Sequence, residues 1–142
     1  MLKILLYIDI NQLGYRLNFL DRAIAYAQAL EGEFLLLTVL PDYNSYFVSP
    51  LLPEHFAEKA HAKALEALEE FAVRYIPEEL VKNLIIRYGL IHTEILAVAE
   101  EEQVNLIFLN SDRAEPVDYL LGRIEGRINR RAPCDIVLLR DR

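Results

Sequence analysis

Five short apolar runs, each followed by a segment with helical periodicity or a polar loop, constrain this chain more than any other feature. The runs span residues 2–8, 34–40, 83–88, 105–109 and 136–139. Their length and nearly continuous apolar character are typical of parallel strands buried on both faces. Between them, apolar residues recur at helical spacing over residues 15–30, 54–75 and 93–102, and a further helix is expected from Leu121 or Gly122 to residue 131. We expect Gly32 to end the first helix as a left-handed C-terminal cap.

This alternation predicts an α/β fold, because neighbouring parallel strands need a crossover helix between them. Such crossovers are right-handed and place helices on both faces of the sheet, so we expect a three-layer sandwich around a five-stranded parallel sheet. The chain has no internal repeat, low-complexity segment or linker, and residues 1–142 are therefore expected to form a single domain.

The longest irregular stretch, residues 41–53, is unusually apolar for a loop and includes Tyr43, Phe47, Leu51 and Leu52. Two interpretations stay open for it. The segment packs over the end of the sheet, or it closes over a ligand site, as long loops in compact domains often do.

Charge and cysteine content exclude several classes of function. The formal net charge of −7 argues against non-specific binding to nucleic acid or to anionic membranes, which needs a basic surface. No apolar run approaches the length of a membrane span, and the apolar start lacks the length and cleavage site of a signal peptide, so we expect a cytoplasmic protein. The one cysteine, Cys134, rules out an internal disulfide and favours burial as a small hydrophobic residue.

Candidate ligand-binding residues follow from the expected sheet. Ligands of open parallel sheets bind beyond the carboxyl ends of the strands, where the strand order reverses. If the first and fourth strands flank that point, the candidates are Asp9, Ile10 and Asn11, residues 110–113, and the neighbouring Val39 and Leu40. The helix that begins near Gly122 would direct free backbone N–H groups towards an anion at the same place.

Four stretches of the chain carry a family resemblance. ILLYIDIN at residues 4–11, LLLTVLP at 35–41, RYGLIHTEILAVAEEEQVNLIFLNS at 87–111 and YLLGRIEGRINRRAPCDIVLLR at 119–140 together resemble the universal stress protein family. The resemblance is closest to the F/G-type branch, because Ser111, Arg113 and the Tyr-Leu-Leu-Gly of residues 119–122 match its Ser-x-Arg and Tyr-Leu-Leu-Gly signatures.

The resemblance implies a Rossmann-like, adenine nucleotide alpha hydrolase-like fold with strand order 3-2-1-4-5. It also implies binding of ATP or a related adenine nucleotide, with which Mg²⁺ could bind. By the same resemblance, Asp9 matches the aspartate near the base and ribose, and Val39 matches the backbone segment at the adenine edge. The family's phosphate loop, Gly-x-x-Gly followed by Gly-Ser or Gly-Thr, is altered here: Asn110 and Arg113 replace the first two glycines, and only Gly122 remains.

Arg123 occupies the hydroxyl position of that loop, followed by Ile124, and two interpretations remain open. Arg113 and Arg123 could bind phosphate oxygens through paired hydrogen bonds, in a non-enzymatic, nucleotide-responsive regulator. Alternatively, Arg123 fills the cleft and pairs with Asp118 or Glu125, which leaves a protein-interaction module. A third interpretation, an enzyme acting on a phosphorylated metabolite, has in its favour only the cluster of Arg123, Arg127, Arg130 and Arg131.

No residue is an obvious activator of water, so we expect no enzyme, although slow ATP hydrolysis stays open. The three histidines are not spaced as a metal pair on one helical turn, and no metal site is expected. The resemblance further implies an antiparallel homodimer through the terminal strand, residues 136–140. Such a strand would be an apolar sheet edge, which invites pairing with a second copy.

Overall fold

The computed structural model describes residues 1–12, 18–45, 49–111 and 132–140. The elements in chain order are β1 (Leu2–Tyr7), the 3-10 turn η1 (Ile10–Gln12), α1 (Asn18–Ala29), β2 (Gly32–Leu40), η2 (Ser49–Leu51), α2 (Phe56–Tyr75), η3 (Glu78–Leu80), β3 (Val81–Tyr88), α3 (Ile91–Glu101), β4 (Leu106–Ser111) and β5 (Asp135–Arg140). Each strand lies within two residues of its predicted bounds. The helix expected up to residue 131 lies outside the described residues.

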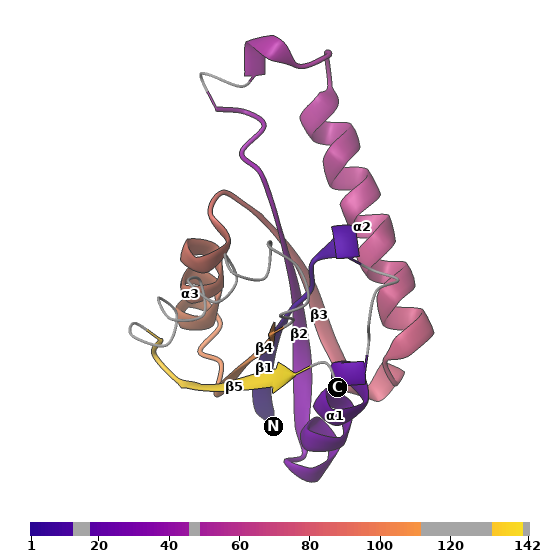
Figure 1. Cartoon of the computed structure of the whole chain (residues 1–142), viewed down its shortest axis with the longest axis vertical. Coiled ribbons are helices and arrows are strands. Elements are labelled where there is room, and N and C mark those ends of the chain that lie inside the picture. The colour runs from indigo at the N-terminus through magenta and orange to yellow at the C-terminus, as the bar shows by residue number, and fades with distance from the viewer. Residues whose placement is uncertain (13–17, 46–48, 112–131, 141–142) are drawn as a thin grey trace.

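The five strands form one sheet with the order β3-β2-β1-β4-β5, and every neighbouring pair is parallel. This confirms the predicted α/β class and strand order. Helices α1 and α2 lie on one face of the sheet and α3 on the other (Figure 1). The chain therefore has the three-layer arrangement that the alternating pattern predicted.

Two apolar clusters, one on each face of the sheet, hold the layers together. Alternate residues of β1 supply both: Ile4 and Leu6 pack with α1 and α2, whereas Leu5 and Tyr7 pack with α3. Because successive side chains of a strand point to opposite faces, a central strand with helices on both sides must be apolar throughout. This requirement explains the continuous apolar run at the start of the sequence.

The expectation for Gly32 is wrong. The left-handed residue at the end of α1 is Glu31, with φ 54°, and Gly32 is the buried first residue of β2. A Cβ atom on Gly32 would lie 2.9 Å from Ile4 Cδ1 and 3.1 Å from the carbonyl oxygen of Leu2. Glycine is needed here for close packing against β1, and not for its backbone freedom.

Cys134 lies just before β5 and is half-buried against the α3-side cluster, so the expected burial is only partial. Burial raises the pKa of its thiol, and the charge of Asp135 raises it further. No helix in the described part of the chain combines the length and apolar character that crossing a membrane requires.

Candidate functional site

The central feature of the candidate site is the point where β1 and β4 part. The two strands pair from Ile4↔Leu106 to Leu6↔Phe108. Beyond the Leu6↔Phe108 pair, β1 remains paired with β2 only. The amide of Ile8 donates to the carbonyl of Leu37 at 2.8 Å. Over the same stretch β4 stays with β5 as far as Ser111↔Arg140. The strands thus separate at their carboxyl ends, which is the place where open parallel sheets bind ligands.

Seven of the predicted site residues lie at or just beyond strand ends on this edge of the sheet. Asp9 follows β1, Ile10 and Asn11 lie in η1, Val39 and Leu40 end β2, and Asn110 and Ser111 end β4. Parallel pairing of β2, β1 and β4 brings these ends to the same edge. Arg113, Gly122, Arg123 and Ile124 lie outside the described residues.

Asp9 shapes the chain directly after β1. Its Oδ1 accepts a hydrogen bond of 3.0 Å from the amide of Asn11, two residues later. Such an Asx turn holds the backbone in a compact bend, in this case η1. The second carboxylate oxygen of Asp9 has no hydrogen-bond role in this turn, so the turn does not use up the acceptor capacity of the side chain.

Asn110 carries an unusual polar atom. Its Oδ1 is buried and has no hydrogen-bond partner within the part of the chain that the structure describes. A buried acceptor without a partner is destabilising by roughly 1–3 kcal/mol, and such atoms in native proteins call for a physical explanation. A ligand that donates a hydrogen bond at the end of β4 would provide one.

Tyr7, the last residue of β1, is a neighbour of this site that the sequence did not indicate. Its side chain is buried, and burial, followed by the negative charge of Asp9, raises the pKa of the phenol. The phenol is neutral at physiological pH, two residues before the Asp9 carboxylate in sequence. A tyrosine within an apolar run gives no signal that distinguishes it from any other core residue.

An aromatic group lies at the end of the edge strand β3. The rings of His61 on α2 and Tyr88 on β3 are stacked, 5.9 Å apart at 20°, and His61 Nδ1 is hydrogen bonded to the Tyr88 hydroxyl. Burial, and then the neighbouring Tyr43, raises the pKa of Tyr88. This contact connects α2 to the carboxyl end of β3, and the sequence separation of its two residues hid it from pattern analysis.

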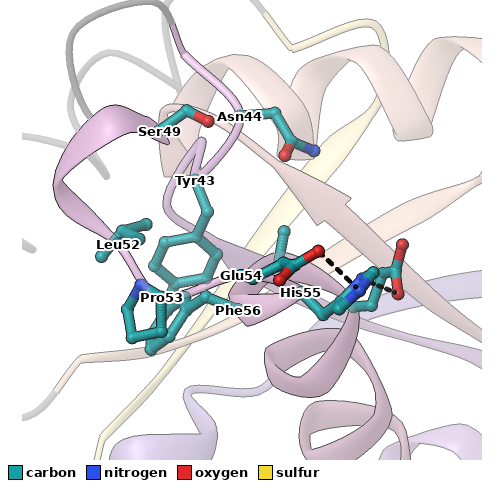
Figure 2. Close-up of a pocket in the computed structure, with 10 residues that line it drawn as sticks. Tyr43, Asn44, Ser49, Leu52, Pro53, Glu54, His55 and Phe56 are labelled. Carbon is teal, nitrogen blue, oxygen red and sulfur yellow. Dashed lines mark hydrogen bonds and ion pairs between the residues drawn. The ribbon is translucent and has the colours of Figure 1, made fainter.

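Residues 41–45 and 49–55 project beyond the carboxyl edge of the sheet together with the first turns of α2 (Figure 1). Tyr43 packs edge-on against Phe56 with ring centroids 5.1 Å apart. Next to this pair lies a cavity of about 270 Å³, shown in Figure 2. None of the seven predicted nucleotide-binding residues that the structure describes lines it.

His55, which has the left-handed φ of 62° just before α2, is one of the polar residues that line this cavity. Its ring nitrogens lie 3.4 Å from a Glu54 oxygen and 3.2 Å from a Glu58 oxygen (Figure 2). A carboxylate thus lies beside each ring nitrogen. Across the described residues, no group of three or more histidine, cysteine, aspartate and glutamate side chains is arranged to hold a metal ion.

On the α3 face, Arg87 of β3 makes a second polar cluster. Its Nε donates to Glu94 at 3.0 Å and its Nη1 donates to Glu101 at 2.7 Å. These bonds raise the pKa of Arg87 and lower that of Glu101. The guanidinium therefore fastens α3 to the sheet, and its donors are engaged within the protein.

Comparison with known proteins identifies the family. The model of the universal stress protein family matches residues 1–140. The chain belongs to the universal stress protein family. Among solved structures, the hypothetical protein PH0823 is similar, with 27% identity and a TM-score of 0.72 over 99% of this chain and 96% of that one.

Two further family structures share the fold. The universal stress protein UspA from Lactobacillus plantarum has 25% identity and a TM-score of 0.68, over 98% of this chain and 97% of its own. A universal stress protein in complex with cAMP has 14% identity and a TM-score of 0.61, over 99% of this chain and 98% of its own. At that identity the second likeness establishes the fold alone.

Proposed function

We propose that this universal stress protein is a regulatory protein that binds ATP or a related adenine nucleotide where β1 and β4 part. The observation that carries the proposal is the separation of the strands after Leu6 and Phe108, with the buried Oδ1 of Asn110 at the end of β4, which has no hydrogen-bond partner among the described residues. The family structure in complex with cAMP supports the same class of ligand.

Each candidate residue has a role that its chemistry allows. The Asp9 carboxylate accepts hydrogen bonds from ribose hydroxyls, and the backbone of Val39 and Leu40 contacts the adenine edge. Asn110 Oδ1 gains a donor from the ligand. Ile10, Asn11 and Ser111 border these groups. Arg113, Gly122, Arg123 and Ile124 bind the phosphates and their Mg²⁺ ion. Arginine binds phosphate oxygens bidentately, and the backbone N–H groups at the start of a helix attract anions.

The proposal includes the F/G-type branch of the family, a single domain and a cytoplasmic location, and it assigns no catalytic residue. Nucleotide binding acts by changing association with a partner protein. It also includes a homodimer through β5, the edge strand whose Leu138 is 43% exposed. An exposed apolar edge favours antiparallel pairing with a second copy.

Isothermal titration with ATP and Mg²⁺, and separately with cAMP, tests the nucleotide site. We expect binding at millimolar or lower nucleotide, and Asp9→Ala should weaken it at least about tenfold, the effect of roughly 1.4 kcal/mol. Asp42→Ala is the matched control, because Asp42 makes the same kind of turn, accepting from the amide of Asn44 at 3.3 Å. No heat from the unaltered protein at millimolar ATP would overturn the proposal.

Light scattering during size-exclusion chromatography tests the dimer. We expect a particle of twice the 16.4 kDa chain mass at micromolar concentration. Leu138→Lys should convert it to the monomer, because a lysine on the edge opposes strand pairing. A monomeric unaltered protein would contradict the dimer while leaving the nucleotide site open to its own test.

A further inference from the structure

An apolar groove of about 380 Å³ runs between the carboxyl end of α2 and the start of β3, and none of the described residues proposed to bind nucleotide lines it. Its apolar surface comes from Ala72, Val73, Ile76, Val81 and Leu84. Figure 1 shows α2 lying along β3 on this flank of the molecule. The groove therefore joins one helix to the outermost strand of the sheet.

The groove is open because β3 is the edge strand of the sheet. A helix that packs on an edge strand has no further strand on its outer side to cover it. Ile76 and Ala72 form a floor that is 4% and 6% exposed, whereas Val73 stands at the rim with 87% of its surface exposed. An isolated exposed valine is ordinary, but one that continues a buried apolar floor makes a surface able to receive an apolar side chain.

Both charged residues that line the groove are acidic. Glu69 lies one helical turn before Val73, and Glu78 lies in η3, beyond the end of α2. The nearby cation Lys82 is not among the lining residues, and its ammonium lies 4.0 Å from Glu33 on β2. The apolar floor is thus framed by carboxylates.

This charge pattern distinguishes between possible occupants. A second copy of the same surface, related by a twofold axis, would bring acidic rims together in a protein whose net charge is already −7. A segment with apolar side chains flanked by lysine or arginine matches both the floor and the rim. Complementary charge of this kind sets specificity and association rate more than affinity.

The geometry points to this groove as a docking site for a basic amphipathic segment of a partner protein. An apolar side chain of the segment packs against Val73 and Ile76. Its neighbouring cations pair with Glu69 and Glu78. A helix that presents apolar residues three and four apart fits such a groove, since helices bind in this way through one apolar stripe.

The test uses a fluorescein-labelled synthetic helix of about 14 residues, roughly four turns, with leucine at three- and four-residue spacing and lysine elsewhere. Fluorescence anisotropy at physiological salt measures its binding to the full chain. A second peptide keeps the leucines and replaces every lysine with glutamate. We expect the lysine peptide to bind and the glutamate peptide to bind at least about tenfold more weakly, because like charges then meet at the rim.

Two variants locate the binding, and each has a matched control. Val73→Ser and the double variant Glu69→Gln, Glu78→Gln should each weaken the lysine peptide by about fivefold, the size expected from one lost apolar contact or two exposed ion pairs. Leu51→Ser removes another exposed apolar side chain, 82% accessible, and Glu70→Gln removes a glutamate of α2 outside the groove. Both controls should leave the affinity unchanged.

Three results would overturn the inference. The first is equal binding of the lysine and glutamate peptides. The second is loss of binding in the control variants to the same extent as in the groove variants. The third is concentration-dependent self-association that Val73→Ser abolishes, since this would assign the groove to a second copy of the chain. All three are independent of nucleotide binding, so the two proposals can fail separately.

Discussion

Replacing Asn110 with leucine should show separately how much its buried side-chain oxygen destabilises the fold and how much that oxygen contributes to nucleotide binding. The Oδ1 atom of Asn110 is buried without a partner in the described structure. An unsatisfied buried acceptor destabilises a protein by about 1–3 kcal/mol, whereas an apolar group of similar shape at the same place is close to neutral or stabilising. After allowing for imperfect packing, we expect Asn110→Leu to raise the free energy of unfolding by about 1 kcal/mol, or about 3 °C in Tm for a chain of this size.

The assay is urea and thermal unfolding without nucleotide, followed by circular dichroism, and Asn105→Leu is the matched control. Asn105 is also an asparagine of the β4 region, but its Oδ1 accepts a hydrogen bond of 2.8 Å from the amide of Lys3. Removing it leaves that amide without its partner, so Asn105→Leu should lower stability by about 1 kcal/mol. The two variants are therefore expected to change stability in opposite directions.

Addition of ATP connects this prediction to function. A ligand that binds only the folded state stabilises it in proportion to RT ln(1 + [L]/Kd), so ATP should raise the Tm of the unaltered protein. Asn110→Leu should gain less, because leucine accepts no hydrogen bond. If Asn110→Leu is instead destabilised as much as Asn105→Leu, the amide oxygen of Asn110 has a hydrogen-bond partner in solution and its burial carries no cost that a ligand could relieve.

Two further predictions concern packing and pH. Gly32→Ala should lower the free energy of unfolding, measured in urea, by about 1–3 kcal/mol, because the added methyl group overpacks against Ile4. When Gly32→Ala is already present, Ile4→Val should destabilise the protein less than it does alone, since valine lacks the Cδ1 atom that clashes. Simple additivity of the two free-energy changes would contradict the clash. For Tyr7, burial raises the phenol pKa in the folded state, so the unfolded chain loses its proton first, above about pH 10. The free energy of unfolding should then fall with rising pH by up to roughly 1.4 kcal/mol per pH unit. Tyr7→Phe should flatten this slope when urea unfolding is repeated between about pH 8 and pH 11. An unchanged slope would exclude Tyr7 as its source.

The fold was largely predictable because its main features are local. Period-two and period-3.6 patterns recur every few residues, so the strands and helices could be located within a few positions from the sequence alone. The strand order came from the family resemblance, and the structure confirms it. Gly32 was misread because a glycine after a helix fits a C-terminal cap equally well, and only the distance to Ile4 shows its packing role.

The candidate site was predictable in part. Polar residues directly after apolar runs, such as Asp9 and Asn110, stand out in a sequence, and parallel topology brings their strand ends to one edge. Tyr7 could not be found in this way, because its phenol lies within an apolar run and its environment depends on the packing of α3 against the sheet.

By itself, the sequence determined which segments are strands and helices, which residues face the core, and that the sheet is parallel, because these properties depend on the spacing of apolar residues along the chain. The tertiary structure alone decided where β1 and β4 part, that the buried Oδ1 of Asn110 has no partner among the residues it describes, and where α2 leaves a groove beside β3. These features depend on contacts between residues far apart in the chain, and their geometry is set by how the layers pack.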